Sequence, residues 1–157
     1  ARTGASRLVV AGDLIHAPAG KTTATLSAIE SFLEACRIPV TLVLGNHDRN
    51  SGALPRDWNL EIVTALDLDG WHIVHDPADA PKDRASIAGH WHPAIRIPDG
   101  KRTSLRLPCF WLRGKNLVLP SFGSFTGGQV VTPLEGHRIF SVLRDQVVEL
   151  PQALWKP

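Results

Sequence analysis

The stretch Leu-Val-Val-Ala-Gly-Asp-Leu-Ile-His, residues 8–16, decides how this chain is expected to fold. Its short, valine-rich apolar run predicts a buried strand, and Gly12 ends that run just before side chains that can bind a metal ion. Two later segments repeat this order: Leu-Val-Leu-Gly-Asn-His-Asp at 42–48 and Ser-Ile-Ala-Gly-His-Trp-His-Pro at 86–93. Ligands of open α/β sheets collect beyond the carboxyl ends of the strands. The three segments therefore predict a cleft that gathers four side chains: Asp13, Asn46, His90 and His92.

The spacing of the other apolar residues predicts a sheet core with helices outside it. Residues 22–37 have apolar side chains at helical spacing, with Thr22 or Thr23 as the N-cap and Pro39 beyond the end. Strands are predicted at 7–11, 40–44, 60–64, 71–74, 85–88, 104–112, 116–119, 138–143 and 146–150, with turns at 69–70 and 144–145 and a loop at 51–59. Alternating strand and helix, followed by strand after strand, indicates the α/β class.

The composition fits one compact domain. The chain has 157 residues, of which 43% are hydrophobic, and 17 Lys and Arg against 15 Asp and Glu leave a net charge of +2. That balance neither requires nor excludes nucleic acid as a partner, because phosphate binding needs only a local basic patch. No apolar run is long enough to span a bilayer and no signal peptide precedes the first apolar segment, so the expected location is cytoplasmic.

The side chains after the three glycines suit divalent cations that act on a phosphate. A carboxylate such as Asp13 can bridge two cations, and Asn46 offers a neutral amide oxygen. Neutral imidazoles suit Zn, Mn, Fe or Ni better than Mg or Ca. Two cations about 3.5–4 Å apart can clamp a phosphate and lower the pKa of a bridging water. His47 is then free to protonate the leaving oxygen or to stabilise the transition state, and Asp48 is expected to orient its imidazole and raise its basicity.

Together these motifs resemble the ordered set of the calcineurin-like metallophosphoesterases. The matching segments are Gly-Asp at 12–13, Gly-Asn-His-Asp at 45–48 and Gly-His-Trp-His at 89–92. The resemblance implies a four-layer αββα sandwich and hydrolysis of a phosphodiester by attack of a metal-bound hydroxide on phosphorus. It also implies two divalent metal ions, with Mn as the first choice and Fe, Zn or Ni as alternatives.

The same resemblance assigns a role to each matching residue. The metal ligands would be Asp13, Asn46, His75, His90 and His92, with Asp13 bridging both ions and His92 serving the ion that the other three do not. His75 is chosen because it ends a strand just before a turn, and the competitor His72, three residues earlier, lies on the opposite face of that strand. Catalysis would fall to His47 and Asp48, and substrate binding to Asn46, His47 and Arg49.

A narrower resemblance covers nearly the whole chain. It is carried by Gly-Asp-Leu-Ile-His (12–16), Gly-Ala-Leu-Pro-Arg-Asp-Trp (52–58), Leu-Arg-Leu-Pro-Cys-Phe (105–110) and Leu-Pro-Ser-Phe-Gly-Ser-Phe-Thr-Gly-Gly (119–128). These segments are similar to the bacterial ligase-associated DNA damage response endonucleases. The similarity implies a nuclease in DNA repair, with a DNA ligase, an exonuclease and a helicase as candidate partners. The alternatives are a hydrolase for nucleotides or other small phosphate esters, and a non-catalytic, metal-bearing subunit of a repair complex.

One motif of that family does not occur in the sequence. The family has an N-terminal Asp-x-His, which ends its first strand and gives two ligands to the metal that His92 serves. The sequence also contains no Met, and it begins about where the family's second core strand begins. We therefore expect a single metallophosphoesterase domain, residues 1–157, that lacks the first strand and helix of the fold.

Several residues keep two interpretations. His16, three residues after Asp13, is expected beside the cleft or on the surface rather than as a ligand, and Trp91 is expected to border the site. His137 is expected to be solvated. Segment 121–128 is either a phosphate cradle or a structural loop. The basic residues that form either a track for a nucleic-acid backbone or a solvated surface are Arg49, Arg56, Arg96, Lys101, Arg102, Arg106 and Arg113.

Overall fold

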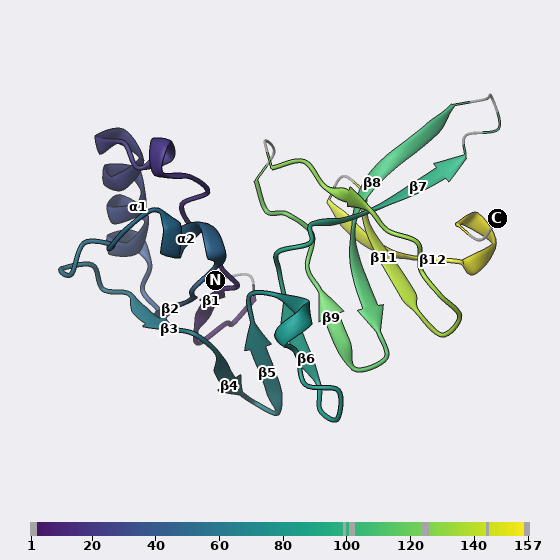
Figure 1. The fold of residues 1–157 in the computed structure, drawn as a ribbon, viewed down its shortest axis with the longest axis horizontal. Coiled ribbons are helices and arrows are strands. Elements are labelled where there is room, and N and C mark those ends of the chain that lie inside the picture. The colour runs from purple at the N-terminus through teal and green to yellow at the C-terminus, as the bar shows by residue number, and fades with distance from the viewer. Residues whose placement is uncertain (1–2, 99, 101–102, 124–125, 144, 156–157) are drawn as a thin grey trace.

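The computed structural model describes residues 3–98, 100, 103–123, 126–143 and 145–155. Within them the strands form two sheets, which stand side by side in Figure 1. The first half contains β1 (Leu8–Val10), the 3₁₀ helix η1 (Pro18–Gly20), α1 (Thr23–Ala35), β2 (Val40–Val43), α2 (Asn46–Asn50), β3 (Glu61–Val63), β4 (Leu66–Leu68) and β5 (Trp71–Val74). The second half contains η2 (Pro77–Asp79), β6 (Ser86–Ala88), β7 (Pro93–Pro98), β8 (Ser104–Arg113), β9 (Asn116–Val118), β10 (Gln129–Val130), β11 (Arg138–Leu143), β12 (Gln146–Leu150) and η3 (Gln152–Leu154).

The smaller sheet is parallel, in the order β1-β2-β3, and α1 packs against it. As predicted, α1 begins after Thr22, whose side-chain oxygen accepts the N–H of Thr25 at 3.2 Å. Leu33 of the helix packs with Val40 and Trp58 in a buried cluster. Because β1, β2 and β3 are parallel, their carboxyl ends lie at the same edge of the sheet, where the motifs follow β1 and β2.

The larger sheet runs β10-β7-β8-β9-β6-β5-β4, with β11 beside β8 and β12 beyond β11. Strands β5, β6 and β9 are parallel neighbours, whereas β7, β8, β11 and β12 pair in antiparallel fashion. Its core includes Ile95, Cys109, Ile139 and Leu150, and burial raises the pKa of the Cys109 thiol to about 12. The parallel part positions the candidate site, and the antiparallel part extends away from it (Figure 1).

The predicted strands are all present, but one α-helix, three strands and the three short 3₁₀ helices were not predicted. Helix α2 begins inside the Gly-Asn-His-Asp motif and has only five residues, too few for a periodic signal. Strands β4 and β10 are as short as two or three residues, and β7 begins and ends with proline, which disfavours a strand assignment. Parts of the predicted turn at 144–145 and the basic pair 101–102 lie outside the described residues.

The structure combines sheets with few helices, which agrees with the predicted α/β class. In the described part of the chain, α1 forms one helical layer on the smaller sheet, and no second helical layer covers the larger sheet. No helix among these residues is both long enough and apolar enough to cross a membrane.

Candidate metal centre

The candidate site lies where the carboxyl ends of β1, β2, β5 and β6 meet between the two sheets. Asp13 follows β1, Asn46 and His47 follow β2, His75 follows β5, and His90 follows β6. The N–H of Gly89 donates to the carbonyl of His75 at 3.0 Å, which holds the ends of β5 and β6 together. Strand ends distant in sequence thus deliver their side chains to one place, as the three motifs predicted.

Asp13, His75 and His90 form a first group, called the inner group, in which one ligand atom of each lies within 4.8 Å of the others. The side chains of Asp13 and His75 are only 8% and 7% exposed. Nε2 of His75 lies 3.0 Å from Nδ1 of His90, 3.0 Å from Oδ1 of Asn46 and 3.4 Å from Oδ2 of Asp13. Two imidazole nitrogens, a carboxylate and an amide oxygen therefore converge in a partly buried space.

The hydrogen bonding of His75 shows that this donor set fits a cation. Nδ1 of His75 donates to the carbonyl oxygen of Ala11 at 2.9 Å. In a neutral ring, Nε2 then keeps its lone pair, and that lone pair faces the oxygens of Asn46 and Asp13. A ring fixed through its other nitrogen by a backbone carbonyl is the usual arrangement of a metal-binding histidine. The mix of nitrogen and oxygen donors suits Mn, Fe, Zn or Ni.

The backbone of the site is strained at three of the predicted ligands. Asp13, His90 and His92 have φ values of 56°, 57° and 44°, in the left-handed region that side chains with a Cβ rarely adopt. Such a conformation costs about 1–3 kcal/mol for each residue and persists only where the surroundings enforce it. Three of the four non-glycine residues described with positive φ are candidate ligands, and this concentration supports a functional reason for the strain.

Two motif glycines are required for close approach rather than for a turn alone. A Cβ on Gly12 would stand 2.0 Å from Nδ1 of His75, and one on Gly45 would stand 2.1 Å from Oδ1 of Asp13. Both distances are far inside contact range, so only glycine lets the strand ends come together.

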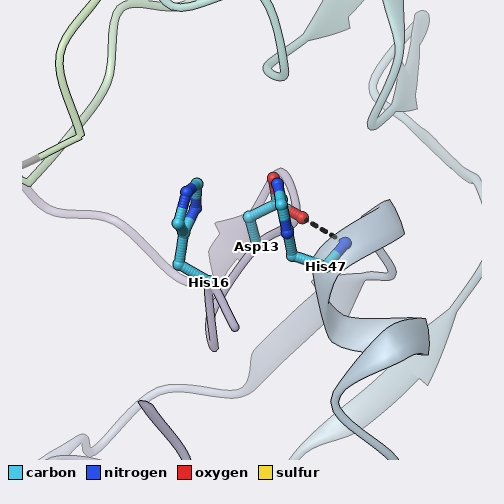
Figure 2. Close-up of side chains that lie close together, drawn as sticks. All are labelled: Asp13, His16 and His47. Atoms are coloured by element: carbon cyan, nitrogen blue, oxygen red, sulfur yellow. Dashed lines mark hydrogen bonds between the residues drawn. The ribbon is translucent and has the colours of Figure 1, made fainter. Parts of the chain in front are cut away.

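A second group, called the outer group, shares Asp13 and adds His16 and His47 (Figure 2). Their ligand atoms also lie within 4.8 Å of one another, and the His16 and His47 rings stack with centroids 4.1 Å apart. Oδ1 of Asp13 accepts the backbone N–H of His47 at 3.0 Å, the dashed line in Figure 2. From the sequence, His16 was expected beside the cleft or on the surface rather than as a ligand. It is exposed, but it also faces His47, and its spacing three residues after Asp13 was the available signal.

Asp48 does not have the place expected for it. Its Oδ2 accepts the backbone N–H groups of Asp13 at 2.8 Å and Gly45 at 3.0 Å, and its Oδ1 accepts that of Ile15 at 3.0 Å. The three hydrogen bonds described for the Asp48 carboxylate therefore come from backbone N–H groups, and none comes from the imidazole of His47. With 2% of its surface exposed, Asp48 is a buried carboxylate that ties the loop after β1 to the start of α2.

His92 lies near both groups without belonging to either. Burial lowers the pKa of His92, the nearby carboxylate of Asp13 opposes this shift, and His16, His90 and His75 add to the lowering. The lowered pKa favours the neutral ring, which is the form that can bind a metal. Asp76, which the sequence analysis did not single out, places Oδ2 3.7 Å from Nε2 of His90.

Two further residues considered in the sequence, His72 and Arg49, have different surroundings. His72 is turned away from the centre and contacts Asp67 at 2.7 Å and Arg84 at 2.8 Å, so the structure favours His75 over it as a member of the site. Arg49 lies exposed on α2, with Nη2 3.5 Å from the carbonyl oxygen of Leu44.

Trp91 lies between the candidate ligands His90 and His92 in the sequence, and its side chain contacts Trp111 and Arg113 of β8. Its ring lies 6.1 Å from that of Trp111, and the guanidinium carbon of Arg113 is 4.9 Å from both ring centroids. The guanidinium of Arg113 therefore stabilises this aromatic pair.

Comparison with known proteins shows that this chain is similar to a nuclease whose structure has been solved. The nuclease MPE of Pseudomonas putida is similar to this chain with a TM-score of 0.79 and 33% sequence identity, over 92% of this chain and 70% of the nuclease. No protein-family model matches the chain, and no curated protein matches it significantly. Similarity of this extent, in sequence and in fold together, is that of a relative.

Proposed function

Because this chain belongs to the family of the Pseudomonas putida nuclease MPE, we propose that it is a metal-dependent phosphodiester hydrolase acting on nucleic acid. The observation that carries the proposal is the convergence of Asp13, Asn46, His75 and His90 on one partly buried space. A ligand set held by strained backbone and by glycine contacts is costly to build, and a bound cation is what makes it useful.

The residues proposed to hold divalent cations are Asp13, Asn46, His75, His90 and His92. Cations bound there supply Lewis acidity to a phosphate and make a water molecule more acidic. We propose two ions, with Mn as the first choice and Fe, Zn or Ni as alternatives, as the resemblance to metallophosphoesterases implies.

His47 is proposed as the catalytic residue of the chain. Its backbone is held by Asp13, and its ring lies on the accessible side of the centre beside His16. From there the imidazole can donate a proton to the leaving oxygen of the phosphodiester. Asp48 is proposed as a positioning residue, because it holds the loops that carry Asp13 and His47. Asn46 and Arg49 are proposed to contact the substrate.

The finer parts of the proposal rest on the family resemblance. They are the ligase-associated branch, the role in DNA repair, the partners among ligase, exonuclease and helicase, the cytoplasmic location, the single domain over residues 1–157, and the complete four-layer αββα sandwich. Each goes beyond the similarity to a nuclease and needs its own test.

The direct test is turnover of bis-p-nitrophenyl phosphate and nicking of supercoiled plasmid after addition of Mn. We expect Asp13→Asn to reduce both to background and His47→Ala to lower them about 10²–10⁴-fold while metal binding persists. Arg37→Gln, which removes an exposed charge after α1 at the opposite end of the smaller sheet, is the control.

Failure of the wild-type protein to hydrolyse either substrate with Mn, Fe, Zn or Ni would reject the enzyme and favour a non-catalytic metal-binding subunit. Hydrolysis of cyclic nucleotides without nicking would instead assign the activity to small phosphate esters.

A further inference from the structure

Segment 89–92 carries two candidate ligands on a strained backbone. His90 and His92 have φ values of 57° and 44°, in the left-handed region that a Cβ disfavours. The first N–H of the segment donates to the carbonyl of His75 at 3.0 Å, and its last carbonyl accepts the N–H of Gln129 at 2.9 Å. These bonds fix the two ends. Strained residues keep their conformation only where the surroundings enforce it, so the middle of the segment needs an anchor as well.

Trp91 lies in the middle of this segment, and its side chain contacts β8. Its ring centroid is 6.1 Å from that of Trp111, with an angle of 43° between the two planes. The guanidinium carbon of Arg113 is 4.9 Å from both ring centroids, so one cation contacts two aromatic rings. Trp111 and Arg113 are two residues apart on β8, and their side chains therefore share one face of that strand. Trp91 thus has a cation–π contact with a neighbouring strand.

The β8 side of this contact is itself firmly held. The ring N–H of Trp111 donates to Nδ1 of His137 at 3.1 Å, and the centroids of these two rings are 5.5 Å apart. In the sheet, Trp111 stands opposite Val118 of β9 and Ile139 of β11, which are both fully buried. Nε of Arg113 is buried as well. Ligands supported by packed side chains on a rigid element are placed more precisely than ligands on an unsupported loop.

We propose that Trp91 and Arg113 are positioning residues of the metal centre, which hold His90 and His92 in their strained conformation through the cation–π contact. The contact transmits the rigidity of β8 to the two imidazoles, so the ligands are ordered before a cation binds. Preordered ligands lose less conformational entropy on binding, and the cation is bound more tightly. The inference rests on the proposed metal centre and adds two residues outside the ligand set that control its affinity.

The first test measures metal binding in the absence of any substrate. Isothermal titration calorimetry with Mn²⁺ compares substitutions that remove the cation–π contact with substitutions that keep it. Trp91→Leu removes the aromatic face and Arg113→Met removes the charge, while both keep apolar bulk. Each should weaken Mn²⁺ binding about tenfold. Trp91→Phe and Arg113→Lys keep the face and the charge, and should stay within about threefold of the wild type.

The second test measures the order of the ligand segment without metal. Hydrogen exchange of the backbone amides of segment 89–92, followed in EDTA, reports how often this segment opens. We expect Arg113→Met and Trp91→Leu to exchange about tenfold faster than the wild type there, and Arg113→Lys and Trp91→Phe to exchange at nearly the wild-type rate.

Two control variants make similar changes away from the metal centre. Arg138→Met removes a guanidinium that lies 4.9 Å from the Phe140 ring, the same distance as in the Arg113 contacts. Trp155→Leu removes an indole that packs against the core of the larger sheet. Both should keep the Mn²⁺ affinity and the exchange rates of the wild type. Urea unfolding checks that each variant is folded, and if Trp91→Leu is not, the three Arg113 and Arg138 variants decide.

The proposal is overturned if Arg113→Met binds Mn²⁺ as tightly as Arg138→Met, or if Arg113→Lys loses as much affinity as Arg113→Met. Unchanged exchange in segment 89–92 of Arg113→Met would overturn it too, and so would a wild-type protein that binds no Mn²⁺. Weaker Mn²⁺ binding and faster exchange in Arg113→Met, in a protein that hydrolyses no phosphodiester, would support the positioning role and reject the proposed activity. Wild-type Mn²⁺ binding by Arg113→Met, in a protein that cleaves nucleic acid, would do the reverse.

Discussion

The inner and outer groups share one carboxylate, Asp13, but the chain holds them in different ways. In the inner group, His75 is buried, its Nδ1 is hydrogen-bonded to Ala11, and Gly12 leaves just enough space for its ring. In the outer group, His16 is exposed, and its ring contacts His47 by stacking. Rigid, buried donors suit an ion that must be kept between turnovers, whereas an open histidine pair suits a substrate that must enter and leave. We therefore expect the inner group to bind the ion and the outer group to act on the substrate, with Asp13 shared between them.

The largest expected effect comes from removing one histidine from each group, which tests whether the two groups have different roles. His75→Ala should weaken Mn binding at least about 100-fold, because it deletes a ligand together with its anchored geometry. His16→Ala should change Mn affinity less than about threefold and act on turnover instead. Isothermal titration calorimetry of both variants, with phosphodiester turnover measured in parallel, checks the division. Equal losses of Mn affinity in the two variants would show that the outer group also binds the ion.

A second prediction concerns the space that the inner group needs. Gly12→Ala should lower the free energy of unfolding by about 1–3 kcal/mol, because a Cβ at this position overlaps the His75 ring and φ is +92°. Mn binding should weaken as well, since His75 must move. Urea denaturation measures the first effect, and calorimetry measures the second.

Gly20→Ala is the matched control for Gly12→Ala, because nothing lies within 4 Å of a Cβ at Gly20. Its unfolding free energy should stay within about 0.5 kcal/mol of the wild type. If Gly12→Ala also had the unfolding free energy of the wild type, the close approach of Gly12 to His75 would not constrain the fold.

The smallest expected effect concerns His137, a histidine outside both groups. Its Nδ1 accepts hydrogen bonds from the Trp111 ring N–H at 3.1 Å and from the N–H of Leu134 at 3.0 Å. Burial, and then the charge of Arg113, lower the pKa of His137. The sequence-based expectation of a solvated His137 therefore misses a partly buried ring whose neutral form is needed.

The sign of the pH effect follows from that lowered pKa. Below the unfolded-state value of about 6.5, the unfolded chain binds more protons than the folded one, so stability is complete above this pH and falls as pH drops towards the folded pKa. We expect the His137 contribution to be under about 1 kcal/mol, because the ring is partly solvated. Denaturant unfolding at about pH 7.5 and 5.5 should show a smaller pH dependence in His137→Gln than in the wild type. An unchanged dependence would assign it to groups other than His137.

Much of the fold was predictable because the signals are local. The helix after Thr22 and the strands β2, β11 and β12 have clear periodicity and clear ends, and their observed bounds differ little from the predicted ones. Short elements such as α2 and β10 depend on tertiary contacts, and the sequence signal for them is weak. The candidate site was predictable for the same reason, since each motif lies at a strand end.

The details of the site were not predictable in this way. The Asp48 side chain, expected at His47, is taken up by backbone N–H groups from two different loops, and sequence order does not reveal which donors will reach it. The stacking of His16 on His47 likewise depends on how the loop after β1 meets α2.

The sequence by itself determined which residues can do chemistry, because residue type, glycine position and strand periodicity are encoded locally. It named Asp13, Asn46, His75 and His90, and the structure brings these four together. Only the tertiary structure decided that Asp13 is shared by a buried group and an open one. The physical reason is that distance, burial and backbone strain arise where strand ends from two sheets meet, and no segment of the chain contains that information alone.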